Sequence, residues 1–517
     1  MLYLERRNYM EKRFDNQPNI LLIMTDQQRS DSLGCYGADW VETPNLDTIA
    51  ADGVVFENCY VTNTICTPSR ASMWTGKHLP GHGVYKLYDN LPQDQVLFSE
   101  LLQEAGYTTG LFGKLHVSGR LFEANNRHPH DGFDEYEWCM EASIHLDSPY
   151  NGYAKWLETN HPDFFGQLKS KGRELLHHSK EVHFTHWAAE RSIDFIHRHA
   201  GKTPFFCCMS VFDPHNPYND YPEEMRSRVD MDKIPKNVTD DREDAPDGVL
   251  QEREHSYLGK FSDFSGADVK QMRLGYYASI ALIDEEVGRV LSALEEKGVT
   301  DNTIVIFVSD HGDMLGDHGI LVKGAFFYDA GVKVPLIIRW PARIGAGKRI
   351  KALVQPHDLS ATILNAAGVI KAGNECTTRY HDGRSLLPLT AGDVDKIREH
   401  AVCAYRNSGI SDKKRPWDPP IHCTMIRDKR YKLSLYHTDP DGRGELYDMV
   451  NDPNELHNLF YSAEYAAVRQ ELTDSLLQWT VNQELKELGS RGGEQLPGKK
   501  DQIDNMINCK GAPHDEK

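Results

Sequence analysis

The sequence predicts an α/β fold in which helices flank a large, mixed and mostly parallel sheet, followed by a smaller C-terminal α+β subdomain with a short antiparallel sheet. Two observations predict the large sheet. Short continuous apolar runs, such as residues 19–25 and 303–308, are typical of parallel strands that are buried on both faces. Segments with helical spacing of apolar residues alternate with these runs along the chain. A third observation, short alternating strands within residues 401–437, predicts the subdomain.

The expected elements follow in chain order. In the main sheet we expect strands at residues 19–25, 54–60, 108–112, 204–212, 303–308 and 334–340, and helices at about 43–52, 95–105, 181–199, 267–297 and 358–367. The polar, proline-rich residues 218–265 are expected to form a long excursion over the surface. The subdomain should contain strands at 401–406 and 423–437, a turn-rich connector at 444–459 and a helix at about 461–485.

These elements divide the chain of 517 residues into four regions. A charged leader covers 1–18, the main domain 19–370, the subdomain 371–488 and a tail 489–517. The main domain carries the polar residues that follow its strands, so we expect it to be the catalytic domain.

Composition excludes some classes of function. The formal net charge of −19 argues against a nucleic-acid groove. No run reaches the roughly 18–20 apolar residues that span a bilayer, so no membrane segment is expected. The charged N-terminus lacks the apolar core of a signal peptide, and the ten cysteines lack paired spacings. These features favour a cytoplasmic protein, or a periplasmic or secreted one if a leader has been removed.

Residues 64–76 hold the most informative stretch of the chain. Pro68 suits the first turn of a helix and Gly76 its end, so Cys66 should lie just before a helix N-terminus. The helix dipole and free N–H groups there favour an anionic ligand. Arg70, one turn further on, can face the same point. A buried thiol beside a structural arginine is the alternative interpretation.

Other polar side chains follow the ends of predicted strands, where ligands collect in open α/β sheets. They are Asp26 and Gln27, Lys114 and His116, His215, and Asp310 and His311, with Lys323 thirteen residues past Asp310. Oxygen atoms of Asp26, Gln27 and Asp310 suit a hard divalent cation, Ca²⁺ first and Mg²⁺ second. His311 would also admit Mn²⁺.

The string Cys66-Thr-Pro-Ser-Arg70 resembles the C-x-P-S-R activation signature of the type I, formylglycine-dependent sulfatases of the alkaline-phosphatase-like superfamily. Gly113-Lys-Leu-His116, Pro214-His-Asn-Pro217 and the C-terminal Glu-Leu-Tyr-Asp string occur in the family's chain order. The resemblance implies that an activating, formylglycine-generating enzyme oxidises Cys66 to formylglycine, whose hydrated aldehyde is the nucleophile.

The resemblance also implies a role for each site residue. Asp26, Gln27, Asp310 and His311 would hold the metal, and Arg70 the sulfate oxygens. Asp310 would help to deprotonate the attacking hydroxyl, and His215 with Lys323 would serve the leaving alcohol. His116 would take the proton of the second hydroxyl and so release sulfate, while Lys114 would position the formylglycine.

Some residues depart from the family pattern. Many sulfatases have two adjacent Asp where this chain has Asp26-Gln27, and Asn where it has His311. The Asp-Gln and Asp-His pairs, and Leu315-Gly-Asp-His318, resemble phosphonate monoester hydrolases instead, although those enzymes typically lack Gly-Lys-x-His. Hydrolysis of phosphonate monoesters or phosphodiesters is therefore the alternative function, and non-catalytic binding of a sulfated or phosphorylated ligand is a second.

The substrate is expected to be a small-molecule or oligosaccharide sulfate ester, most plausibly a sulfated saccharide. Substrate choice would lie with residues 120–265 and the subdomain, whose polar residues suit hydroxyls or a carboxylate: Arg120, Arg127, His128, His130, His145, Arg406 and His422. An oligomer is compatible with the sequence, and no nucleic-acid or membrane partner is expected.

Overall fold

The computed structural model describes residues 17–175, 179–239, 245–370, 381–408 and 417–491. In this part of the chain nine strands form one sheet, in the order β4-β3-β5-β1-β6-β8-β2-β7, with β9 paired to β2. Strands β4, β3, β5, β1 and β6 run parallel, and β8 is antiparallel to β6 and β2. The strands are β1 (Asn19–Thr25), β2 (Val54–Tyr60), β3 (Thr108–Gly113), β4 (Glu135–Trp138), β5 (Phe205–Ser210), β6 (Thr303–Ser309), β7 (Lys333–Val334), β8 (Leu336–Arg339) and β9 (Lys348–Val354). The mixed, mostly parallel sheet that the sequence predicts is confirmed.

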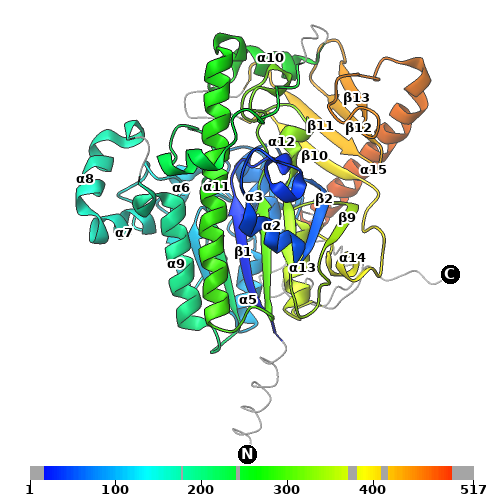
Figure 1. Ribbon diagram of the computed structural model, residues 1–517. Helices are drawn as coiled ribbons and strands as arrows, with labels where there is room; N and C mark the ends of the chain where they lie inside the picture. The colour runs from blue at the N-terminus through cyan, green and yellow to red at the C-terminus, as the bar shows by residue number, and fades with distance from the viewer. Residues whose placement is uncertain (1–16, 176–178, 240–244, 371–380, 409–416, 492–517) are drawn as a thin grey trace, which may run out of the picture.

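Helices cover both faces of this sheet. They are α2 (Pro44–Ala51), α3 (Cys66–Thr75), α4 (Leu79–His82), α5 (Phe98–Glu104), α6 (Arg120–Glu123), α7 (Gly152–Asn160), α8 (Pro162–Lys171), α9 (Phe184–His199), α10 (Asp247–His255), α11 (Gly266–Glu296), α12 (Asp329–Val332), α13 (Asp358–Ala366) and α14 (Leu387–Ala391). Helices α9 and α11 stand side by side on one face (Figure 1). Along β1, Leu21 and Ile23 pack on that face, whereas Leu22 and Met24 pack with α3 on the other. This alternation explains why the strand is apolar throughout.

The C-terminal sheet is antiparallel, as expected. It consists of β10 (Ala401–Arg406), β11 (His422–Arg427), β12 (Tyr431–Tyr436) and β13 (Gly444–Asp448), and the long helix α15 (Ala466–Arg491) packs across it (Figure 1). Val402, Ile426 and Leu433 form a small core with Leu472 and Leu476 of α15. Alternate residues of β10, such as Cys403 and Tyr405, face the core of the main domain instead.

Several expected boundaries differ from those observed. The strand expected at 334–340 is divided, because Pro335 lacks the N–H that a continuous ladder needs. The connector expected at 444–459 begins with strand β13, whose polar Glu445 is buried because it accepts hydrogen bonds from the hydroxyls of Tyr328, Tyr436 and Tyr447. The helix expected from 461 begins at Ala466, after a 3-10 turn at 463–465.

The surface excursion expected at residues 218–265 is wrong in part. Tyr218, Tyr221 and Met225 lie in the core, and α10 buries Val249 and Glu252. The sequence pattern hides this packing because the apolar residues are isolated among charged ones. Within the described residues, no helix has the length and apolar character to cross a membrane. The leader and tail lie largely outside the described residues.

Candidate functional site

Cys66 is the first residue of α3, one position further into the helix than expected. The Asn63 side chain accepts a hydrogen bond from the backbone N–H of Ile65, which fixes the turn into the helix. The Cys66 side chain is buried, with 2% of its surface exposed. Its Sγ lies 2.9 Å from Lys323 Nζ and 3.3 Å from His311 Nε2. The thiol therefore lies in an electropositive pocket rather than in an apolar core.

This environment changes the acidity of the thiol. Burial and the Asp26 carboxylate both act to raise the pKa of Cys66, but the ammonium groups of Lys323 and Lys114 outweigh them and lower the pKa to about 7. The other described buried cysteines behave in the opposite way, because burial raises the pKa of Cys59, Cys139 and Cys208. Cys66 thus has the properties of a reactive cysteine.

Carboxylate and imidazole groups meet beside the thiol. The ligand atoms of Asp26, Cys66, Asp310 and His311 all lie within 4.8 Å of one another. Asp26 follows β1, and Asp310 and His311 follow the adjacent strand β6, so the parallel register brings them together. Asp26 Oδ1 is buried without a hydrogen-bond partner. His311 Nδ1 donates to the Gly312 carbonyl, so Nε2 is the ring nitrogen that faces Cys66. Burial opposes protonation of this ring, but the Asp310 carboxylate outweighs it and raises the pKa of His311.

Two cations, Arg70 and Lys114, hold the two carboxylates. The Arg70 guanidinium is fully buried, and it donates from Nε to Asp310 Oδ2 at 2.6 Å and from Nη1 to the Lys114 carbonyl at 2.9 Å. Lys114 Nζ forms an ion pair with Asp26 Oδ2. Burial opposes ionisation of Asp26, but the charge of Lys114, with further cations nearby, holds the pKa of Asp26 well below its usual range. Arg70 therefore orients Asp310 and Asp26 as well as adding positive charge.

Lys323 connects the thiol to two histidines. Its ammonium group lies 2.9 Å from His215 Nε2 and 3.2 Å from His311 Nε2, as well as 2.9 Å from the sulfur. His215 Nδ1 donates to the Asn216 carbonyl, so the Nε2 lone pair accepts from Lys323. Burial and the charge of Lys323 hold the pKa of His215 well below its ordinary value, which keeps this ring neutral.

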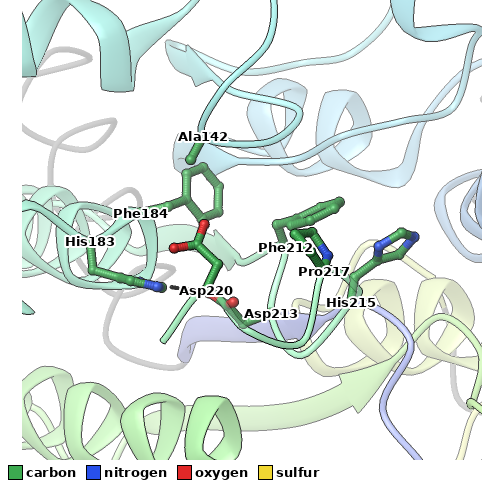
Figure 2. A pocket seen from close by; sticks show the side chains of 8 residues that line it. All are labelled: Ala142, His183, Phe184, Phe212, Asp213, His215, Pro217 and Asp220. Carbon is green, nitrogen blue, oxygen red and sulfur yellow. Dashed lines mark ion pairs between the residues drawn. The ribbon is translucent and has the colours of Figure 1, made fainter. Parts of the chain in front are cut away.

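The His215 loop also borders a small cavity. The ring of His215 lies 4.5 Å from that of Phe212. Figure 2 shows both rings near Pro217, with Asp213 and His183 among the other residues that line the cavity. The cavity has a volume of about 20 Å³, which suits roughly one water molecule. This volume is too small for a saccharide.

The tautomer of His116 follows from its neighbours. Thr67 Oγ1 donates its hydrogen to the Leu87 carbonyl and lies 3.0 Å from His116 Nε2, so Nε2 must donate to Thr67. Nδ1 is then unprotonated, and it is buried without a hydrogen-bond partner. Burial and the charge of Lys114 keep the pKa of His116 well below its ordinary value. The ring therefore presents a free basic nitrogen.

Gln27 is held differently from the other proposed ligands. Its backbone has a φ of 66°, in the left-handed region, and its backbone N–H donates to Asp310 Oδ1. The side-chain Nε2 donates to Asp313 at 2.6 Å and to Asn216 at 3.3 Å. The oxygen Oε1 is buried without a hydrogen-bond partner. The amide oxygen is thus the atom of Gln27 that remains available to a ligand.

Two supporting carboxylates were missed in the sequence. Asp313 is fully buried and fixes Gln27, while also accepting from Tyr218. Its position three residues after Asp310 could have indicated in the sequence that Asp313 lies near the site. Glu123 accepts from the backbone N–H groups of His116, Val117 and Ser118, and so holds His116 at a φ of 57°. The sequence gives no signal for this contact, because it depends on the fold of the loop.

Some of the expected specificity residues have structural partners. Arg127 is bound to Asp131, His128 lies near the Pro92 carbonyl and His130 near Glu100. Arg406 and His422 lie opposite one another on β10 and β11.

A buried nucleophilic side chain, two fixed carboxylates and three cations at the carboxyl edge of a mostly parallel sheet define a hydrolase of anionic esters with an alkaline-phosphatase-like fold. Comparison with known proteins agrees. The Sulfatase family model matches residues 18–369, and the model of the N-sulphoglucosamine sulphohydrolase C-terminal region matches residues 316–482. The chain belongs to the sulfatase family, and the protein is an enzyme of that family.

Named relatives cover almost the whole chain. An N-acetylglucosamine-6-O-sulfatase of Bacteroides thetaiotaomicron is 29% identical over 92% of this chain and 88% of the relative. An arylsulfatase of Clostridium perfringens is 30% identical over 87% of this chain and 91% of the relative. Among solved structures, a phosphonate monoester hydrolase of Agrobacterium radiobacter has a TM-score of 0.73 and 26% identity, covering 90% of this chain and 96% of that one.

Proposed function

We propose that this protein uses a formylglycine made from Cys66, together with a divalent cation, to hydrolyse the sulfate ester of a saccharide. The observation that carries the proposal is the position of Cys66 Sγ, which lies within 4.8 Å of ligand atoms of Asp26, Asp310 and His311 and receives a hydrogen bond from Lys323. A thiol that served only to pack the core would not need this surrounding charge.

The residues present fit a divalent cation. Asp26 Oδ1 and Gln27 Oε1 are buried oxygens without partners, and His311 Nε2 lies 3.7 Å from Asp26 Oδ1 and from Asp310 Oδ1. We infer that Asp26, Gln27, Asp310 and His311 hold the cation, Ca²⁺ first, with Mg²⁺ and Mn²⁺ as alternatives. The cation would supply charge neutralisation at the sulfate oxygens.

A formylglycine at position 66 would supply a hydrated aldehyde, with one hydroxyl to attack sulfur and a second to release the sulfate. Oxidation of Cys66 must precede folding, because the side chain is buried in the folded protein. The formylglycine-generating enzyme is therefore a partner of the unfolded chain.

Different residues of the chain would then carry out the separate proton transfers. Lys323 and His215, joined at 2.9 Å, would deliver a proton to the leaving alcohol. His116 would accept a proton at Nδ1, because its Nε2–H is committed to Thr67. Arg70 would keep Asp310 and Asp26 aligned, and Lys114 would balance the charge of Asp26.

A saccharide substrate is supported by the relative named for N-acetylglucosamine-6-O-sulfate chemistry, which spans nearly the whole chain. A screen of sulfated mono-, di- and polysaccharides beside an aryl sulfate tests this part of the proposal. We expect release of sulfate from at least one sugar. Activity confined to aryl sulfates would contradict it.

One observation favours a second candidate, a phosphonate monoester hydrolase: the structural likeness to the Agrobacterium radiobacter enzyme. A paired assay decides between them. One aryl leaving group is offered as a sulfate, a phosphonate monoester and a phosphodiester, and kcat/KM is measured for each. We expect the sulfate to be preferred. A higher value for the phosphonate would assign the second function.

A further inference from the structure

A second cavity lies beneath α15, where the C-terminal sheet meets the α3–α4 region. Its volume is about 210 Å³, enough for a small organic molecule rather than for one water. Val402, Ala404 and Arg406 line it from one face of β10, because alternate residues of a strand share a face. Trp479 and Gln483 of α15 line the opposite wall.

Arg406 gives this cavity an uncompensated positive charge. The side chain is half-buried, and its Nη1 donates to the carbonyls of Tyr405 and Cys423 and to Thr424 Oγ1. Among the described residues no carboxylate forms an ion pair with it. Burial lowers the pKa of Arg406, as expected of a guanidinium without a counter-ion. Other buried arginines of the described chain, such as Arg70 and Arg398, are paired with aspartates.

Two buried oxygen atoms on the cavity wall also lack partners. Thr62 is 2% exposed and Gln483 is 5% exposed, and neither Thr62 Oγ1 nor Gln483 Oε1 has a hydrogen-bond partner. Leaving such groups unsatisfied is costly, so each is a place where a bound molecule would gain a hydrogen bond. Hydroxyl groups of a ligand, each with one hydrogen, can donate to these two oxygens.

The aromatic lining residues favour a ligand that contains a ring. Tyr85 and Trp479 contribute aromatic surface, which is apolar on its faces and polar at one edge. A cation, two hydroxyl acceptors and aromatic walls together match a sugar acid, whose carboxylate would pair with Arg406 and whose hydroxyls would meet Thr62 and Gln483.

We propose that this cavity, defined by Thr62, Tyr85, Arg406, Trp479 and Gln483, is a binding site for a sugar acid, separate from the Cys66 pocket. The sugar acid is either a free molecule or a distal unit of the substrate. Thr62 lies only four residues before Cys66, and the backbone N–H of Ala404 donates to the Thr62 carbonyl. The two sites therefore share one segment of chain.

The first test measures binding and needs no turnover, so it stands apart from the proposed function. Thermal stability of the full chain is followed with sodium D-glucuronate as the probe and with glucose as the neutral control. Glucuronate should raise the Tm, and glucose should not. Arg406→Met should weaken glucuronate binding roughly tenfold or more, as expected for lost charged hydrogen bonds.

Two further variants distinguish loss of glucuronate binding from misfolding of the variant protein. Gln483→Glu places a negative charge on the wall and should abolish the glucuronate shift while keeping every contact of Arg406. Arg443→Met, in the same subdomain but outside the cavity, is the matched control and should retain the full shift. Equal shifts in wild type and Arg406→Met, or no shift with glucuronate, would overturn the proposal.

The second test separates the two sources of the ligand. KM is compared between a sulfated disaccharide that carries a uronate and an aryl sulfate that carries no carboxylate. If the sugar acid is a distal substrate unit, Arg406→Met should raise KM for the disaccharide roughly tenfold and leave the aryl sulfate unchanged. If binding is lost in the first test and both KM values are unchanged, the cavity binds a free sugar acid.

Discussion

Two buried clusters of charged side chains use similar residues in different ways. The catalytic cluster, at the nucleophile, consists of Asp26, Arg70, Lys114, Asp310 and Lys323. The inter-sheet cluster, between the two sheets, consists of Asp329, Arg427, Lys432 and Glu455. Lys432 is 1% exposed and lies 2.6 Å from carboxylate oxygens of both Asp329 and Glu455.

The clusters differ in what their cations contact. In the inter-sheet cluster, Lys432 and Arg427 contact the carboxylates and the Tyr60 ring, and Lys333 lies 3.9 Å from Asp329. In the catalytic cluster, Lys323 instead donates to the thiol of Cys66, and Asp26 Oδ1 has no hydrogen-bond partner. Buried charge alone therefore does not mark a functional site, whereas cations placed around a nucleophilic side chain do.

The largest effect on kcat is expected when Cys66, at the centre of the catalytic cluster, is replaced. Cys66→Ala should lower kcat by on the order of 10⁴-fold or more, because the nucleophile is lost, while the Tm stays close to that of wild type. Cys66→Ser should be nearly as inactive, because a serine sulfate has no second hydroxyl to release it. Multiple turnovers of Cys66→Ser at the wild-type rate would contradict the mechanism.

The next largest effect on kcat is expected when His116 is replaced. His116→Ala should lower kcat by roughly 10²- to 10⁴-fold, the usual contribution of a general base. Thr67→Val is the matched variant: it keeps the imidazole but removes the acceptor that fixes its tautomer, together with the hydrogen bond to the Leu87 carbonyl, so it should cost less and shift the pH profile of kcat. An unchanged pH profile in Thr67→Val, together with full activity of His116→Ala, would exclude this role.

The inter-sheet cluster should respond in stability instead. Lys432→Met removes the partner that lies 2.6 Å from both Asp329 and Glu455, and leaves Asp329 only the cations Arg427 and Lys333, each at 3.9 Å. It should lower the free energy of unfolding by about 3–5 kcal/mol. The kcat/KM of the folded fraction should change little. Lys396→Met, which breaks an exposed pair with Glu399, is the control and should have a much smaller effect on thermal unfolding. A selective loss of activity in Lys432→Met would show that the cluster is not purely structural.

The same cluster predicts a smaller, pH-dependent effect. Burial opposes ionisation of Asp329, but the charge of Lys432 lowers the pKa of Asp329 below its ordinary value. A carboxylate with a lowered folded-state pKa stabilises the protein fully above its unfolded pKa of about 3.9, and this stability is lost as pH falls below that value. The Tm of wild type should therefore fall more steeply below about pH 4 than that of Lys432→Met. Parallel curves for the two proteins would contradict this assignment.

The sequence predicted the main features of the fold because they depend on local patterns. Apolar runs identified β1 and β6, and the rule that ligands meet at strand ends selected Asp26 and Asp310. Family resemblance added Lys323, whose place beside Cys66 no spacing rule requires. The roles given to these residues stay predictions.

What the sequence could not predict depends on contacts between distant segments. Glu445 looked like a turn residue because two of its three tyrosine partners, Tyr328 and Tyr436, lie elsewhere in the chain and on the facing strand. Glu123 holds His116 through backbone N–H groups, and because every residue except proline has such a group, the sequence does not indicate this contact. The cavity beneath α15 joins Thr62 to Arg406 and Gln483, which lie more than 300 residues further along the chain.

The most direct test of the central claim is the mass of the peptide that contains residues 64–70, isolated from a host with a formylglycine-generating enzyme. The account predicts that residue 66 has the mass of formylglycine, in which the CH₂–SH group of cysteine has become an aldehyde. The fraction of converted peptide should rise in step with sulfatase activity across preparations. An active preparation in which Cys66 is wholly unmodified would contradict the account.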